Sequence, residues 1–376
     1  MSLSLRGLTW DHPRGYAPLE AASTHYANSY DVQIHWDKRS LKAFGDVPIN
    51  TLAADYDLMV IDHPHMGIAT RSGCLHPLNE LVDDVVVGQL AYESAGLSHQ
   101  SYTYDDKQWA LAVDAAVQAS SYRADLLTYP LPEDWQQVLE LASTLRKDNL
   151  YLAIPLVPTD TMCSFLSLCA SFGYPLSKTD FVTNAQAEAV LIFLKRLAKR
   201  AHPNCLNWNP INTYDAMSQG DEIAYCPLAF GYSNYARGNS NGAVLTFSDI
   251  PGVRGGLLGG AGIAVSKFSE HSQEAAEFSV WVSGGEVQAG VYVEAGGQPG
   301  NVTAWQDDTC NALTNNFFKN TLATLEHAYM RPRDAGFVHF QKFMGNRIHT
   351  FLRSEDDPKN CIQDLREAFE VRLEPS

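Results

Sequence analysis

A short apolar strand, a polar turn and an amphipathic helix open the chain, and this order restricts its fold more than any other feature. Leu5 and Leu8 indicate the end of a buried strand, and a polar turn follows over residues 9–15. An amphipathic helix is expected from about Pro18. This order places side chains at the carboxyl edge of a parallel sheet, beside a helix N-terminus, where open α/β sheets bind ligands. The sequence therefore predicts an α/β fold with a ligand site at this turn.

A second polar cluster follows the next buried strand. Residues 57–61 form an apolar run suited to a strand that is buried on both faces. His63 and His65 come directly after it. We therefore expect a second set of polar side chains at a strand end.

Later segments continue the pattern of strands and helices. Residues 104–109 predict a hairpin turn flanked by 110–113, with a separate strand at 117–122. Other expected strands are 152–157 and the glycine-dense 255–265. Expected helices begin near Pro132, at Asn184 as a cap, and near Glu270, and the C-terminal region is expected to be mostly helical.

Composition excludes several classes of protein. With 376 residues, 45% of them hydrophobic, the chain is long enough for two domains. The net charge of −16 without a basic stripe argues against nucleic acid as a partner. No apolar run reaches the roughly 18 residues of a membrane span. Seven cysteines without a CxxC motif predict neither a zinc nor a disulfide framework, so no metal or cofactor is expected.

Signatures of catalysis are absent, with one alternative left open. The glycine-dense stretch lacks the ending of a Walker motif, and Gly-x-Ser-x-Gly does not occur, so we expect no enzyme. The alternative is a metal-dependent hydrolase in which His63 and His65 hold zinc. That reading needs further ligands, and the other histidines do not follow convincing strands.

Several segments, in order, resemble a known family. Residues 132–139, PEDWQQVL, resemble the P-x-T-W-x-E-L-L helix start of the family 1 extracellular solute-binding proteins of ABC importers. The opening T-W-D-H-P-R-G-Y is similar to a subgroup usually labelled carbohydrate-binding. Further segments that resemble the family are 74–81, 108–122, 220–224, 259–265, 276–281 and 297–299. The likeness spans nearly the whole chain.

The resemblance implies a two-lobed, periplasmic-binding-protein-like (Venus flytrap) fold that closes on a ligand. Lobe one would comprise residues 1–115 and 259–305, and lobe two residues 116–258 and 306–376. The hinge would lie near 115–119 and 255–260, where glycines absorb dihedral changes at little cost.

Candidate ligand-binding residues are polar or aromatic groups at the expected lobe edges, since sugars offer an apolar face and hydroxyls. From lobe one they are Trp10, Asp11, His12, Arg14, His63 and His65, and from lobe two Trp208, Tyr232 and Tyr235. Asp114, Gly260 and Gln298 lie near expected crossings or turns. Core packing is the alternative for the aromatic residues. Arg14 would either form a salt bridge that closes the lobes or bind a ligand carboxylate.

The expected ligand is a small polar molecule, namely a sugar, a polyol or a small acid. The expected protein partner is an ABC transporter permease if the protein is exported, and the chain is expected to be a monomer. Family resemblance predicts a periplasmic or extracellular location. The N-terminus lacks a basic and apolar leader, so a cytoplasmic ligand sensor of the same fold is a further alternative.

Overall fold

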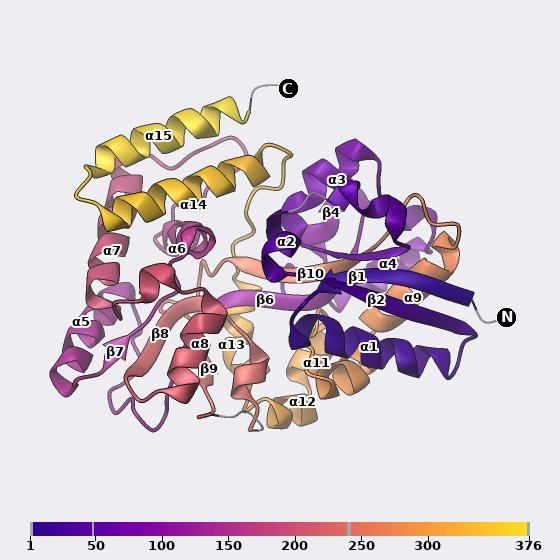
Figure 1. Ribbon diagram of the computed structural model, residues 1–376, viewed down its shortest axis with the longest axis horizontal. Coiled ribbons are helices and arrows are strands. Elements are labelled where there is room, and N and C mark those ends of the chain that lie inside the picture. Colours follow the sequence, from indigo (N-terminus) through magenta and orange to yellow (C-terminus); the bar gives the residue numbers. More distant parts are fainter. Residues whose placement is uncertain (1–2, 47–48, 239–241, 374–376) are drawn as a thin grey trace.

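A computed structural model describes residues 3–46, 49–238 and 242–373. Two halves lie side by side in Figure 1 and are joined at the centre by strands. One half holds the N-terminal elements, and the other holds α5–α8 together with the C-terminal helices α14 and α15. Within the described residues, no helix is both long and apolar enough to cross a bilayer.

The first half is built on a mixed sheet with strand order β2-β1-β3-β10-β6. β1 pairs in parallel with β2 and β3, whereas β10 runs antiparallel to both of its neighbours. The strands are β1 (Leu3–Trp10), β2 (Val32–Arg39), β3 (Leu58–Ile61), β10 (Leu258–Val265) and β6 (Leu111–Tyr122). As predicted, the glycine-dense stretch is a strand.

Alternation along β3 divides the core of this half between the two faces of the sheet. Leu58 and Val60 pack with residues of α1 and α9, whereas Met59 and Ile61 pack with residues of α3. The helices of this half are α1 (Pro13–Ala27), α2 (Leu41–Asp46), α3 (Met66–Ser72), α4 (Asp84–Tyr92), α9 (Ser272–Ser283), α10 (Gly285–Val287) and α11 (Val302–Gln306). A two-stranded hairpin joins β4 (Thr103–Tyr104) to β5 (Lys107–Gln108).

The long strand β6 belongs to both halves. Its first part pairs with β10 as far as Val117, and its second part pairs with β8 (Ile223–Phe230) and β9 (Thr246–Ser248). The prediction of separate strands on either side of Asp114 was wrong, because the 12-residue strand runs through that position. The two halves therefore share one continuous backbone connection at their centre.

The second half surrounds β8, β9 and β7 (Tyr151–Leu152) with helices. In its core, the apolar face of α5 packs with residues of α6, α7, α14 and α15. This face includes Trp135 and Leu139, as predicted. The helices are α5 (Trp135–Leu145), α6 (Pro158–Ser171), α7 (Asn184–Arg200), α8 (Pro210–Gln219), α12 (Asp308–Leu313), α13 (Phe317–Glu326), α14 (Phe337–Arg353) and α15 (Pro358–Val371). All seven cysteines are buried and free.

Three predicted element boundaries were wrong. The first helix begins at Pro13 rather than near Pro18, because proline suits the first helical position. Thr183, and not Asn184, caps α7, since its side chain forms a capping box with Gln186. The strand expected over 152–157 ends at Leu152, because the segment then turns into α6.

Candidate functional site

The N-terminus of α1 brings the first polar cluster to the junction of the two halves. His12 is the N-cap of the helix, with extended backbone, and its Nδ1 accepts a hydrogen bond from the Arg14 backbone N–H at 3.1 Å. This cap ends β1 and starts the helix within two residues. The Arg14 side chain is thereby fixed at the sheet edge.

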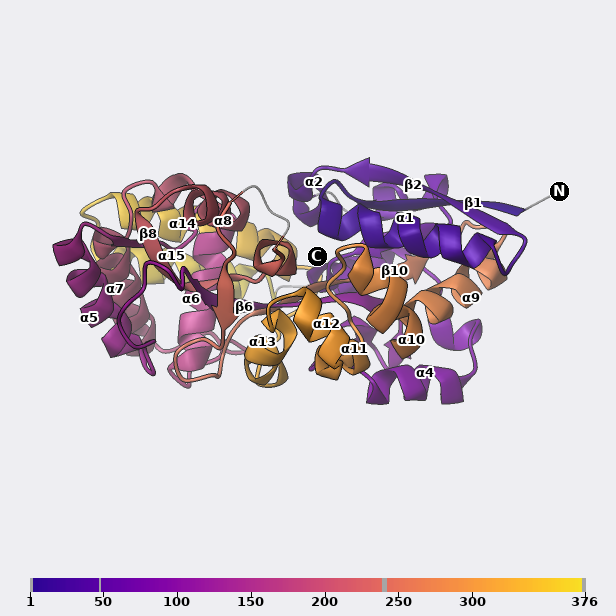
Figure 2. The ribbon, with the colours of Figure 1, turned by 90° about the horizontal axis from the view of Figure 1, so that it is seen from below.

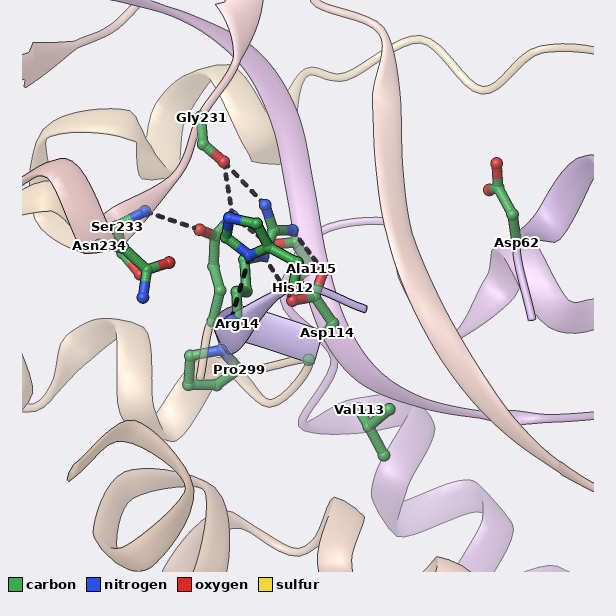
Figure 3. A network of polar contacts seen from close by, with 12 residues as sticks. His12, Arg14, Asp62, Val113, Asp114, Ala115, Gly231, Ser233, Asn234 and Pro299 are labelled. Carbon is green, nitrogen blue, oxygen red and sulfur yellow. Dashed lines mark hydrogen bonds and ion pairs between the residues drawn. The ribbon is translucent and has the colours of Figure 1, made fainter. Parts of the chain in front are cut away.

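Arg14 connects the two halves through a buried network (Figure 3). Its Nε donates to Asp114 Oδ2 at 2.7 Å, and its Nη2 donates to Asp114 Oδ1 at 2.5 Å. Its Nη1 donates to the carbonyl of Gly231, just beyond β8, at 3.0 Å. The guanidinium also lies over the Tyr232 ring, 4.6 Å from its centroid. Arg14 thus forms a salt bridge with Asp114 within the predicted lobe one, and its hydrogen bond to Gly231 reaches the other half.

Electrostatics in this network favour a charged Arg14 and a neutral His12. Burial lowers the pKa of Arg14, but the charge and hydrogen bonds of Asp114 outweigh it and raise the pKa overall. Burial, together with the Arg14 charge, lowers the pKa of His12 to about 4. The His12 ring contacts Tyr232 edge-on at 5.1 Å, so it serves as a neutral packing and capping group.

Gln298 and Gly260 support the network from behind. The Gln298 amide donates to the Ala115 carbonyl at 2.9 Å and accepts from the Ser233 backbone N–H at 3.0 Å. Gly260 pairs with Ala115 and has φ of +108°, and a Cβ there would lie 2.3 Å from the Asp114 carbonyl oxygen. Both predicted residues therefore hold β6 in place beside Arg14.

A second polar group lies at the end of β3. Asp62 forms an ion pair with Arg331, with 3.3 Å between the charged atoms. Burial raises the pKa of Asp62, but the positive charge of Arg331 outweighs it, and the pKa falls to about 2. His63 is fully buried, its Nδ1 is 3.2 Å from Asp62, and burial lowers its pKa to about 4. His65 is also buried. This group lies apart from Arg14 in Figure 3, as the position of Asp62 shows.

Two largely buried residues in the second half, Asp160 and Tyr232, have side-chain oxygens without a hydrogen bond to any described residue. The carboxylate of Asp160, in the first turn of α6, is 6% exposed, and among the described residues no hydrogen bond to it is found. The Tyr232 hydroxyl, on a residue 7% exposed, also lacks a hydrogen-bond partner within the described part of the chain. The charge of Asp160 acts on Tyr232, where it adds to the burial that raises the pKa of the phenol. Burial raises the pKa of Asp160 itself to about 7.

Sequence reasoning did not single out Asp160, Asp62 or Arg331. A signal was present for Asp160, because it closely follows the apolar stretch 152–157, as the first two polar clusters follow their strands. Asp62 was passed over in favour of the histidines beside it. Arg331 carries no local signal, since the fold alone brings it from between α13 and α14 to Asp62.

Besides His63 and His65, four of the predicted residues lie outside the Arg14 network. Trp10 is 4% exposed and packs on Phe44 in the core. Trp208 stacks on His202 with ring centroids 4.6 Å apart. The remaining two are Tyr235, whose hydroxyl donates to Asp215, and Asp11, which is exposed. A direct role of these four in ligand binding stays a prediction.

The chemistry of the site is that of polar recognition. Over the residues that the structure describes, no group of three or more His, Cys, Asp or Glu side chains could hold a metal ion. Within that part of the chain, His63 and His65 are not joined by the further metal ligands that the hydrolase alternative requires. The available groups are hydrogen-bond acceptors and donors set between two halves of the molecule.

The fold is similar to solved structures of two-lobed binding proteins. Maltose-bound MalE3 of T. maritima has a TM-score of 0.84 and 18% identity, covering 99% of this chain and 100% of that chain. A solute-binding protein of Thermotoga lettingae with bound alpha-D-tagatose has a TM-score of 0.82 and 15% identity, covering 99% and 100%. One from Agrobacterium radiobacter with ribitol has a TM-score of 0.80 and 16% identity, covering 98% of each chain. These likenesses confirm the predicted two-lobed α/β fold.

A family model identifies the chain more directly than these distant structures do. The model, described as bacterial extracellular solute-binding protein, matches residues 46–317. The match covers well over half of the chain, and it confirms the family that the sequence segments resemble. It includes Asp62, Asp114, Asp160 and Tyr232. The chain belongs to the bacterial extracellular solute-binding protein family.

Proposed function

We propose that this protein reversibly binds a small polyhydroxylated solute, a sugar or polyol, between its two lobes. The observation that carries the proposal is the pair of polar groups, on largely buried residues beside the Arg14 network, that have no hydrogen bond to a described residue: the Asp160 carboxylate and the Tyr232 hydroxyl. The oxygens of both side chains are not among the fully buried atoms, so a ligand can reach them. Ligand hydroxyls would donate to the carboxylate and bond the phenol.

The charge state of the site favours a neutral ligand over an acid. Arg14 and Arg331 are each paired with a carboxylate of the protein, Asp114 and Asp62. A ligand carboxylate would have to displace these pairs and would meet Asp160. Maltose, tagatose and ribitol, named for the three similar structures, are neutral and rich in hydroxyls.

We further propose the lobe boundaries expected from the family, with residues 1–115 and 259–305 in lobe one and 116–258 and 306–376 in lobe two. The hinge would lie in β6 and before β10, where the two strands pair as far as Val117 and Leu258. Contacts that would hold the closed form are Arg14 to the Gly231 carbonyl, at 3.0 Å, and the Gly67 backbone N–H to the Arg333 carbonyl, at 2.9 Å.

Delivery of the solute to an ABC transporter permease, outside the cytoplasmic membrane, completes the proposal. The family description as extracellular supports the location, and the similar structures that are titled as ABC transporter solute-binding proteins support the partner. We expect a monomer that turns nothing over. Neither a metal-dependent hydrolase nor a cytoplasmic sensor is favoured by the comparisons.

Thermal melting against a panel of sugars, polyols, organic acids and Zn²⁺ tests this proposal. A ligand that binds only the folded protein at a hundredfold excess over Kd adds about 2.7 kcal/mol of stability. We expect a shift with a sugar or polyol that is reduced in Asp160→Asn and Tyr232→Phe but kept in Tyr174→Phe, a control at a more exposed tyrosine. A shift with Zn²⁺ alone, or equal shifts in all variants, would refute the proposed site.

A further inference from the structure

A cavity lies on the proposed lobe one, outside the interlobe site. It has a volume of about 480 Å³ and is bounded on one side by α4 and on the other by the segment from Ser94 to Gln108. None of its lining residues belongs to the Arg14 network or to the Asp62 group. Figure 2 shows α4 at the outer edge of the molecule, away from α8 and β8. Its size is within the range of small-molecule sites.

His99 lines this cavity with an imidazole that has no hydrogen bond to any residue the structure describes. The residue is 7% exposed, and among the described residues no hydrogen bond to either ring nitrogen is found. Burial lowers the pKa of the ring to about 4, so at neutral pH it offers one acceptor nitrogen and one N–H. The ring nitrogens are not among the fully buried atoms, so an occupant of the cavity can reach and bond them.

The rest of the polar lining is either satisfied internally or acidic. Thr103 donates to Gln108 at 2.6 Å, and Gln108 donates in turn to the Ala110 carbonyl at 2.7 Å, so these groups form a fixed wall. Asp84 accepts one bond, from Asn79 at 2.9 Å. Its second oxygen has no hydrogen bond to a described residue, and neither has the exposed carboxylate of Asp106.

Cations near the cavity are engaged elsewhere. None of the described residues that line it is Lys or Arg. Lys107, next to Asp106 in the chain, pairs with Glu80 at 3.0 Å. Arg333 donates to the backbone carbonyls of Gln100 and Thr103 and is not part of the lining. The cavity thus presents negative charge and unsatisfied acceptors.

We propose that this cavity, which we call the α4 cavity, is a second binding site that takes a small organic cation bearing amine groups. The amines would donate to Asp84, Asp106 and His99, and the apolar side of α4 at Val87 and Ala91 would cover the carbon chain. A metal ion is not the expected occupant, because these residues form no group that could hold one within the described chain. The site is independent of sugar binding between the lobes.

Gly88 allows the cavity to be filled without disturbing the fold. It lies inside α4 and lines the cavity, and a Cβ at this position would meet no atom within 4 Å. Leucine is also a better helix former than glycine. Gly88→Leu should therefore melt at or above the temperature of the unchanged protein while it occupies the space of a ligand.

Calorimetric titration of the full chain with putrescine, a diamine, and with butanediol, its neutral counterpart, tests the proposal. We expect one putrescine site, no binding of the diol, and a loss of about tenfold or more in affinity for Gly88→Leu and Asp84→Asn. His99→Phe, which keeps the ring without its nitrogens, should also weaken binding. The matched control is Asp308→Asn, because Asp308 is likewise exposed at the start of a helix and follows an aspartate N-cap.

Three results would overturn this inference. Absence of putrescine binding at millimolar concentration would do so, as would equal binding of the diol. Unchanged putrescine affinity in Gly88→Leu, or an equal loss in Asp308→Asn, would show charge attraction to the acidic surface rather than a site. Sugars and polyols should shift the melting temperature equally in Gly88→Leu and in the unchanged protein. A failure of the α4 cavity proposal can therefore be told apart from a failure of the interlobe proposal.

Discussion

Arg14 illustrates how a single side chain can be held by both halves of a protein. Two oxygens of Asp114 and the Gly231 carbonyl accept from its guanidinium, and the residue is 4% exposed. Removing one partner of such a pair leaves an uncompensated buried charge, whereas replacing both can restore stability. Removing one residue of the pair should therefore lower the free energy of unfolding far more than replacing both.

A double-mutant cycle tests this reading of the pair. We expect Arg14→Met and Asp114→Leu each to lower the free energy of unfolding by about 3–5 kcal/mol, and the double variant to lose less than either single change. Urea unfolding of the unliganded protein gives these values. Additive losses would contradict the account, because they would mean that neither charge depends on the other.

The buried carboxyl group of Asp160 should make the folding stability depend on pH. Its folded-state pKa is raised by burial from 3.8 to about 7, so folding favours the protonated form. The unfolded chain ionises first, and stability should fall as pH rises from about 4 to 7 and then level off. The shift corresponds to about 4 kcal/mol at most.

Chemical unfolding of Asp160→Asn over the same pH range checks this sign. The variant should match the original protein near pH 4 and exceed it above pH 7, because the amide carries no charge to bury. The Asp308→Asn control should follow the original protein throughout. Parallel curves for Asp160→Asn and the original protein would show that the Asp160 carboxylate is not penalised by burial.

At the scale of residues, the sequence predicted where polar side chains gather but not which residue each of them would pair with. Periodicity and strand ends predicted His12, Arg14 and Asp114 near the junction, and the fold brings them together with Tyr232 and Gln298. Partner choice depends on residues distant in the chain, as in Arg14 with Gly231 or Asp62 with Arg331. No local pattern encodes such pairs.

At the scale of elements, β6 and β10 carry the connection between the lobes. The glycine-dense β10 was predictable as a strand, because its glycines permit close approach of backbones. The continuity of β6 was not, since Asp114 inside an apolar run is typical of a break. Its charge is tolerated there because Arg14 lies against it.

Gly260 offers a test of this connection. Its φ is +108°, and a Cβ at this position would lie only 2.3 Å from the Asp114 carbonyl oxygen, so there is no room for a side chain. Gly260→Ala should lower the free energy of unfolding by about 1–3 kcal/mol through backbone strain. Gly88→Ala, at an open helical position, should instead raise it by about 0.5–1 kcal/mol.

Thermal or urea unfolding of these two glycine variants gives the comparison. A Gly260→Ala protein as stable as the original would mean that β6 and β10 separate readily at this point. The close pairing beside Asp114 would then not be needed for stability, and the placement of the hinge there would have to be reconsidered.

At the scale of the whole molecule, the two-lobed arrangement was the most predictable feature. Strand–turn–helix order and the family segments predicted it, and solved structures with TM-scores up to 0.84 at under 20% identity share it. The arrangement depends on many dispersed apolar positions, which tolerate substitution. The ligand was less predictable, because a few side chains at the lobe edges determine it.

Calorimetric titration of the full chain with maltose, tagatose and ribitol tests the central claim, which is that a hydroxylated solute binds between the lobes beside Asp160. We predict that at least one of them binds with one-to-one stoichiometry, and that Asp160→Asn weakens this binding by about tenfold to a hundredfold. Binding that is unaffected by Asp160→Asn and Tyr232→Phe, or a complete lack of binding of hydroxylated solutes, would contradict the account.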